Sequence, residues 1–188
     1  TLLSRAGRND DAIAQINREL STLEQQKTQI EAVAPNITDP RQQRQIRQKL
    51  AEIAEQKATL LRTVSYAYQR KGQEAEAKAR LRAAYQLDPD DAGVNNDLGY
   101  ILADTHEDLQ EAERMVRLAL GEQPRQAAYQ DSFAWVLYKK GDLQGAKTWL
   151  QRAIAMEEGQ DPVVYDHLGD VEWRLGDKDA AKKHWQKS

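Results

Sequence analysis

Apolar residues recur along this chain at helical spacing, in stripes too short for long isolated helices. In residues 131–153, the first stripe lies on one helical face and consists of Phe133, Ala134, Leu137 and Tyr138. A second stripe after the turn consists of Leu143, Ala146, Leu150, Ala153 and Ile154. Gly141 separates the stripes, because glycine adopts the left-handed helix-ending conformation at no steric cost, and Asp142 can cap the following helix. The pattern predicts two helices joined by a tight turn, a hairpin that cannot bury its apolar faces without a neighbour.

The same hairpin recurs along the chain. Large apolar residues occupy one equivalent position at spacings of 34, 35 and 35 residues, namely Val64, Leu98, Phe133 and Leu168. Small residues occupy a second position, namely Ala77, Ala112, Ala146 and Ala181. The predicted end of the first helix is marked by Gly72, His106, Gly141 and Gly176. A fixed period of this length is typical of a repeat protein.

The period and motif resemble the tetratricopeptide repeat (TPR) family. Leu98-Gly99 and Leu168-Gly169 match the family's large–small pair, and Val64-Ser65 and Phe133-Ala134 match it loosely. The closing proline is present as Pro89 and Pro124, but Glu158 replaces it in the third unit. The resemblance covers about residues 58–188, with units at 58–91, 92–126, 127–161 and a truncated unit at 162–188. It implies an all-α, right-handed superhelical α-solenoid of helix hairpins, with residues 1–188 as a single TPR domain.

Residues 1–57 depart from the short hairpin pattern. Gly7 is expected to end a partial first repeat. Helices over 11–34 and 41–71 are then expected to form an elongated antiparallel hairpin, with Thr38 or Asp39 as a cap before Pro40. Seam residues alternate by three and four, as in a coiled coil: Ile13, Ile16, Leu20, Leu23, Lys27 and Ile30, then Ile46, Leu50, Ile53, Lys57, Leu60 and Val64. A solvated arm is the favoured interpretation, and a dimerisation or docking arm is the alternative.

Composition and charge narrow the function classes. The chain has no cysteine, so disulfides and thiolate metal sites are excluded. No apolar run approaches the ~18 residues of a membrane-spanning helix, so no direct membrane insertion is expected. The net charge of −3 combines +3 over residues 1–90 with −6 over residues 91–188, and neither half has the clustered basic residues that bind nucleic acid.

Candidate catalytic chemistry is sparse. The three histidines have no triad-like setting, and no metalloprotease, P-loop or dinucleotide-binding motif occurs. Asp166, His167 and Asp170 could hold a metal weakly, but a solvated polar face is favoured. We therefore expect neither an enzyme nor a cofactor. The resemblance of Asp131–Gly141 to repeats of bacterial TPR proteins suggests a bacterial source, and leaves cytoplasm, periplasm and cell envelope open.

The TPR resemblance implies that first helices line a concave groove that binds a partner. Read residue by residue, the groove positions hold Arg62, Tyr66, Asn96, Asp97, Tyr100, Asp131, Trp135, Tyr138, Asp166, Asp170 and Trp173. Aromatic residues repeat at one position, and whether each serves as a groove anchor or as helix packing stays open. We expect a non-catalytic scaffold that binds an apolar or basic peptide or helix. The alternatives are a homo-oligomerisation module and an accessory segment of a larger enzyme.

The same positions predict that the chain is not a clamp for acidic chaperone tails. The residues at the clamp positions are Arg62, Tyr66, Asp97, Ala128 and Ser132. Only Arg62 suits a carboxylate, and Asp97 would repel one. Titration with acidic-tailed peptides should therefore give no binding, and micromolar affinity would contradict the prediction.

Overall fold

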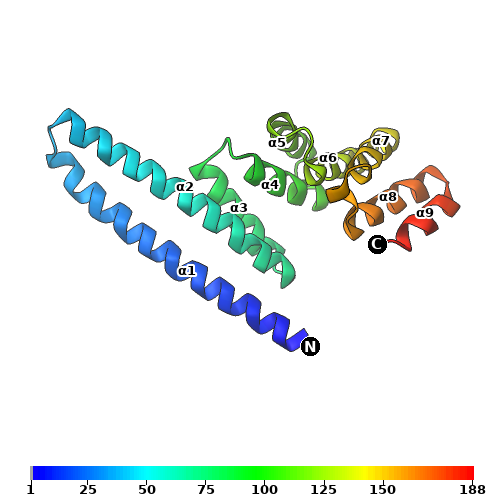
Figure 1. Ribbon diagram of the computed structural model, residues 1–188, viewed down its shortest axis with the longest axis horizontal. Helices are drawn as coiled ribbons and strands as arrows, with labels where there is room; N and C mark the ends of the chain where they lie inside the picture. Colours follow the sequence, from blue (N-terminus) through cyan, green and yellow to red (C-terminus); the bar gives the residue numbers. More distant parts are fainter. Residues whose placement is uncertain (1) are drawn as a thin grey trace. The chain divides into compact units, whose positions relative to one another are not determined.

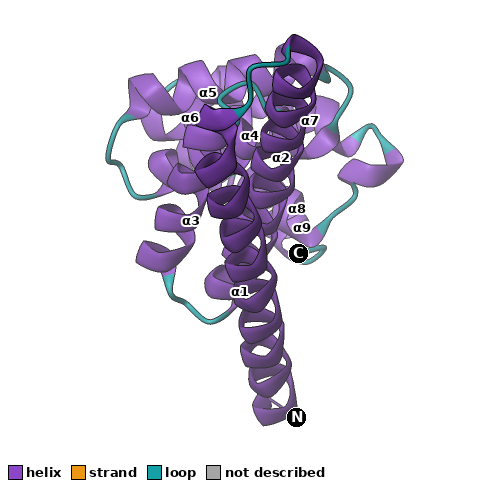
Figure 2. Ribbon diagram, turned by 90° about the vertical axis from the view of Figure 1, so that its left-hand side faces the viewer, coloured by secondary structure: helices purple, strands orange, loops and turns teal. Residues whose placement is uncertain are grey.

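The structure is a computed structural model that describes the backbone of residues 2–188 and the side chains of residues 9–188. The long helices come first: α1 (Leu2–Val33), a 3-10 turn η1 (Ala34–Asn36) and α2 (Pro40–Arg70). Seven shorter helices and one 3-10 turn follow: α3 (Glu74–Leu87), α4 (Ala92–Asp104), α5 (Leu109–Glu122), α6 (Ala127–Lys140), α7 (Leu143–Ile154), η2 (Glu157–Gly159), α8 (Pro162–Leu175) and α9 (Lys178–Trp185). Helices and loops are the only elements over the described residues (Figures 1 and 2), which confirms the all-α fold class.

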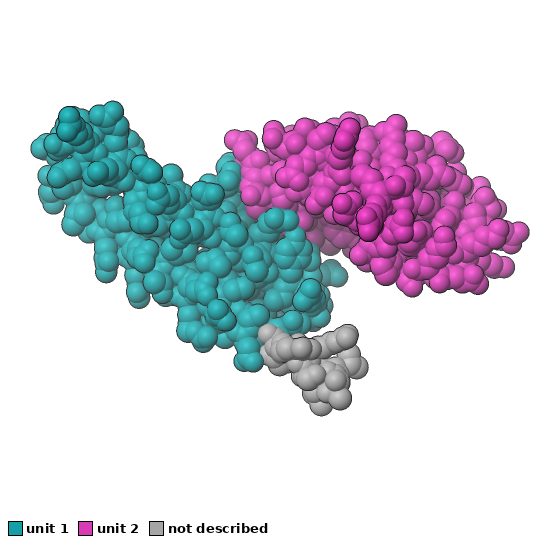
Figure 3. All heavy atoms as spheres, in the orientation of Figure 1, with its two compact units in different colours: residues 1–89 teal, residues 90–188 magenta. Residues whose placement is uncertain are grey.

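The chain divides into two compact units, coloured separately in Figure 3. Unit 1 is Thr1–Pro89 and contains α1, α2 and α3. Unit 2 is Asp90–Ser188 and contains three successive helix hairpins, α4 with α5, α6 with α7, and α8 with α9.

The elongated hairpin predicted near the N-terminus is confirmed, since α1 and α2 run antiparallel to one another (Figure 1). The predicted break at Gly7 is wrong, because α1 is one helix from Leu2 to Val33. A glycine inside a helix costs about 1 kcal/mol relative to alanine, which the continuous hydrogen bonds of a long helix offset. The seam prediction holds in the middle of the hairpin, where Ile53 is buried and the Lys57 ammonium forms an ion pair with Glu24.

Helix ends follow the local signals in the sequence. Asp39 caps α2, with Pro40 at the first helical position, and its Oδ1 accepts hydrogen bonds from the backbone N–H groups of Arg41 (2.7 Å) and Gln42 (3.1 Å). The glycines that close first helices have left-handed backbones, with φ of 69° at Gly72 and 90° at both Gly141 and Gly176. The predicted non-glycine counterpart, His106, also has positive φ, at 55°.

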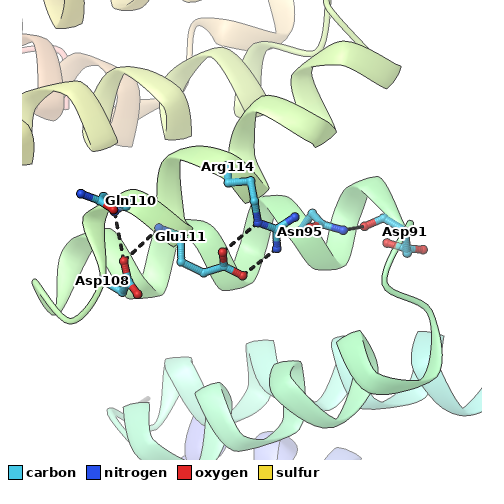
Figure 4. A network of polar contacts seen from close by, with 6 residues as sticks. All are labelled: Asp91, Asn95, Asp108, Gln110, Glu111 and Arg114. Atoms are coloured by element: carbon cyan, nitrogen blue, oxygen red, sulfur yellow. Dashed lines mark hydrogen bonds and ion pairs between the residues drawn. The ribbon is translucent and has the colours of Figure 1, made fainter.

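Unit 2 adds side-chain caps at the start of its first two helices (Figure 4). Asp91 Oδ1 accepts from Val94 N (2.6 Å), and the Asp91 backbone carbonyl accepts from Asn95 Nδ2 (2.9 Å). Asp108 Oδ1 accepts from the N–H groups of Gln110 and Glu111 at the start of α5. These caps satisfy backbone donors that the first turn of a helix leaves without partners.

Two hairpins of unit 2, α4 with α5 and α8 with α9, depend on close approach between their helices. A Cβ added at Gly99 of α4 would lie 2.7 Å from Val116 Cγ2 and 3.0 Å from the Ala112 carbonyl oxygen of α5. A Cβ at Gly169 of α8 would collide with the Trp185 indole of α9. The small member of the large–small pair is therefore a packing residue in these two repeats.

Substitution of Gly99 tests this contact. Because Val116 and the α5 backbone occupy the space that a methyl group needs, Gly99→Ala should lower the free energy of unfolding by about 1–3 kcal/mol. Gly121→Ala is the matched control, since nothing lies within 4 Å of the added Cβ and alanine favours the helix by up to about 1 kcal/mol. Urea unfolding of both variants checks the prediction, and equal destabilisation would contradict it.

Candidate functional site

The first helices of unit 2 form one connected face. Trp135 of α6 donates from Nε1 to Asp104 Oδ1 of α4 over 3.0 Å. His167 of α8 bonds Asp131 of α6 through Nδ1 at 2.8 Å, and its Nε2 lies 3.5 Å from the Tyr100 hydroxyl of α4. Side chains from α4, α6 and α8 therefore meet, and this surface is called the first-helix face below.

Trp135 lies at the centre of the first-helix face and is only 8% exposed. The His167 ring stacks on it at 4.1 Å between centroids and the Tyr138 ring at 4.8 Å. The Lys139 ammonium lies 4.7 Å from the indole centroid. In this structure Trp135 packs between helices, which is one of the two roles that the sequence leaves open.

Several buried polar groups of α4, α6 and α8 are hydrogen-bonded to one another. His167 and Asp131 are both buried, and their hydrogen bond crosses from α8 to α6. Burial raises the pKa of Tyr100 above its ordinary value, with Asp104 and Asp131 adding to the shift, so the phenol stays protonated. Asn96 Nδ2 donates to Asp97 Oδ1 at 3.1 Å, and both residues are buried in α4.

Two cations near the ends of first helices contact the C-terminal turn of the first helix in the preceding hairpin. Lys139 Nζ donates to the Asp104 carbonyl oxygen (3.1 Å) and pairs with the Asp104 carboxylate (3.0 Å) at the end of α4. Arg174 Nη1 lies 3.5 Å from the Tyr138 carbonyl oxygen in the last turn of α6, with its guanidinium 4.7 Å from the Tyr138 ring centroid. Both cations approach a helix C-terminus, where the helix dipole favours positive charge.

A smaller set of side chains remains accessible at α8. Trp173 is 46% exposed, and Asp166 is exposed one helical turn before the half-buried Asp170. Desolvation and the Asp166 charge raise the pKa of Asp170. Trp185 of α9 donates to Asp170 at 3.3 Å, but among the described side chains no lysine or arginine forms an ion pair with Asp166 or Asp170.

Two predicted groove residues belong to unit 1. Arg62 Nη2 donates to the Tyr66 hydroxyl at 3.0 Å along α2, and the guanidinium lies 5.8 Å from the ring centroid. Tyr66 is 40% exposed. The structure describes these two residues within unit 1 and the other nine within unit 2.

The predicted site residues omitted several members of the first-helix face: Asp104, Lys139, His167, Arg174 and Trp185. The first four lie at or next to groove positions of the repeat, so the period could have located them. Trp185 lies on a second helix, and only the open space at Gly169 admits its indole. Over the described part of the chain no group of three metal-ligating side chains occurs, and the His167 ring nitrogens face Asp131 and Tyr100.

Comparison with known proteins identifies the repeat. Residues 63–91 match the family model for the tetratricopeptide repeat. The chain therefore contains a segment that matches a tetratricopeptide repeat, and it is similar to TPR proteins. A TPR repeat-containing protein of Pseudomonas aeruginosa is 29% identical over 174 residues, which are 90% of this chain and 29% of that protein. The chain therefore spans less than a third of the length of this curated relative.

Solved TPR structures share the fold. MamA from Desulfovibrio magneticus is 14% identical with a TM-score of 0.56, over 94% of this chain and 93% of that chain. PilF of Pseudomonas aeruginosa is 16% identical with a TM-score of 0.54, over 95% and 76%. A TPR protein from Parabacteroides merdae is 12% identical with a TM-score of 0.58, over 95% and 78%. These likenesses show a shared helical-repeat fold, an architecture that presents extended surfaces.

A helix that crosses a membrane must be both long and apolar. None of those in the described residues combines the length and the apolar character that crossing a membrane requires.

The raised pKa of Asp170 makes a stability prediction. An acid whose pKa is higher in the folded than in the unfolded chain destabilises the fold when it ionises. The penalty is absent below the unfolded pKa of about 4 and complete above the folded pKa. Asp170→Asn should therefore raise the urea midpoint at pH 7 and leave it unchanged near pH 3.5. Glu158→Gln on the exposed link is the control, and a gain of equal size at both pH values would contradict the assignment.

Proposed function

We propose that the chain is a non-catalytic scaffold that binds a segment of a partner protein on the first-helix face of unit 2. The bound segment carries at least one lysine or arginine beside an apolar side chain. The cation meets Asp166 and Asp170, and the apolar side chain packs on Trp173. The proposal specifies a binding mode for the TPR fold.

The observation that carries the proposal is a pair of carboxylates, without an ion-pair partner among the described side chains, beside an exposed indole. Asp166 and Asp170 lie one turn apart on α8, and Trp173 follows Asp170 by three residues, so all three lie on one side of the helix. Ionised Asp170 is unfavourable in the free protein, because burial and Asp166 both raise its pKa. A cationic ligand would relieve this repulsion, so part of its binding energy comes from strain in the free site.

The remaining groups support a preorganised binding surface. Trp135, His167 and Asp131 are locked by stacking and hydrogen bonds, so they lose little freedom when a ligand arrives. Lys139 and Arg174 are engaged with α4 and α6, and neither forms an ion pair with Asp166 or Asp170 in the described part of the chain.

A peptide selection tests the proposal while the partner protein is still unidentified. A random peptide library displayed on phage is selected on the immobilised chain, and the enriched peptides are synthesised and titrated. We expect enrichment of lysine or arginine next to aromatic or large aliphatic residues. Affinity for those peptides should fall at least tenfold in the Asp166→Asn, Asp170→Asn, Trp173→Ala variant.

The matched control changes exposed residues on second helices and the link, as Glu122→Gln, Gln144→Ala and Glu158→Gln. Like the test variant, this control removes two carboxylates and truncates one exposed side chain, but all three positions lie outside α8. Affinity within twofold of the parent is expected. Enrichment of acidic peptides, or an equal loss of affinity in both variants, would refute the proposed site.

A further inference from the structure

A second surface lies on the elongated hairpin of unit 1. A groove of about 640 Å³ runs between the two long helices. Its walls come from Glu19, Thr22 and Leu23 of α1 and from the stretch of α2 between Glu52 and Leu60. Within unit 1 only α1 and α2 line it, and it is called the hairpin groove here.

The hairpin groove is on the side of the seam opposite to α3. A separate groove that α3 flanks with Arg80 and Leu87 takes Asn17, Ser21 and Glu24 from α1. At about 100° per residue, those α1 residues and the ones in the hairpin groove are centred on opposite sides of α1. α3 thus lies on one side of the seam, where it packs on α2, and the other side has no third helix from unit 1.

The floor of the hairpin groove is apolar and its rim is acidic. Leu23 is 9% exposed, and Leu60 is half-buried beside it. Glu19, Glu52 and Glu55 form the rim, and none of the lining residues is cationic. The ion pair of Glu52 is with Lys49, three residues away and exposed, at 3.2 Å, a surface contact worth at most about 1 kcal/mol.

The apolar character continues toward the tip of the hairpin. Val33 is 54% exposed and follows Thr22 by eleven residues, about three helical turns, so it lies on the same side of α1. From Glu19 to Val33 this side measures about 21 Å at 1.5 Å per residue. That length fits roughly four turns of a helix laid along the groove.

We propose that the hairpin groove binds an amphipathic helix of a partner protein, with an apolar stripe flanked by lysine or arginine. The apolar stripe would contact Leu23, Leu60 and Val33, and the flanking cations would meet the three glutamates. α3 shows a related packing mode on α2, because it packs against α2 and buries Ala77, Leu81 and Ala84, at i, i+4 and i+7. Helix-in-groove recognition uses the same spacing of anchors.

The test uses two synthetic 18-residue helices labelled with fluorescein. The first has leucine at i, i+3, i+4 and i+7 with lysine on both flanks, and the second has glutamate in place of every lysine. Fluorescence anisotropy at low salt should show binding of the lysine helix at least tenfold tighter than the glutamate helix. Binding of the lysine helix should weaken at 0.5 M salt, because salt screens exposed charges.

Charge reversal identifies the surface. Glu19→Lys, Glu52→Lys, Glu55→Lys should reverse the preference between the two helices. The control Glu31→Lys, Glu122→Lys, Glu158→Lys changes the net charge equally and should leave both affinities within twofold. An unchanged preference in the first variant, or the same reversal in the control, would overturn the proposal. Circular dichroism confirms that both variants are folded.

The absence of cysteine allows a direct test of position. A bimane label at Thr22→Cys should be quenched by a tryptophan in the middle of the lysine helix, and a label at Ser21→Cys, on the α3 side, should not. Quenching only at Ser21→Cys would overturn the assignment.

Sedimentation of the free chain tests a second copy as the occupant. A micromolar dimer that the Glu19→Lys, Glu52→Lys, Glu55→Lys variant dissociates would replace the partner helix with self-association.

Discussion

The close contact between the two helices of each repeat is the constraint on which unit 2 depends. Gly99 lets α5 approach α4 until Val116 and the Ala112 carbonyl fill the place of a side chain. Gly169 does the same for Trp185 on α9. Dispersion and burial are strongest at this separation, so the helix pair has one preferred packing. The same approach brings the Trp185 indole within hydrogen-bonding distance of Asp170, and a core contact thereby shapes the candidate site.

Most of the fold could be predicted because its signals are local and periodic. The spacing of Val64, Leu98, Phe133 and Leu168 marks the repeats, and the glycine positions mark the turns. Even His106 follows the rule, since it takes positive φ where the other units use glycine. The continuous helix through Gly7 could not be predicted, because one unfavourable residue is outweighed by hydrogen bonds along the whole helix. The buried Gly159, whose added Cβ would collide with the Ala153 carbonyl, depends on a neighbouring helix that its own sequence does not reveal.

The candidate site was harder to predict because exposure depends on neighbouring repeats. Trp135 and Trp173 both occupy predicted groove positions, yet one is stacked under His167 and the other is 46% exposed. The negative charge of residues 91–188 also gives an incomplete account of the surface. Asp104 is paired with Lys139, and buried Glu172 is paired with Lys147 at 3.1 Å and His184 at 2.7 Å. Only a structure separates carboxylates that hold helices together from those, such as Asp166, that face solvent.

Lys139 and Arg174 each contact the preceding repeat, so these contacts between repeats all run in one direction along the chain. Each cation binds the C-terminal turn of the first helix in the preceding repeat, so that turn gains its partner only after the next repeat has been made. During synthesis on the ribosome, the end of α4 would wait for α6, and the end of α6 would wait for α8. Each first helix therefore provides the partner for the C-terminal turn of the first helix in the preceding repeat. Unit 2 would then assemble repeat by repeat during synthesis. At each stage only the most recently made first helix would lack a partner at its C-terminal turn.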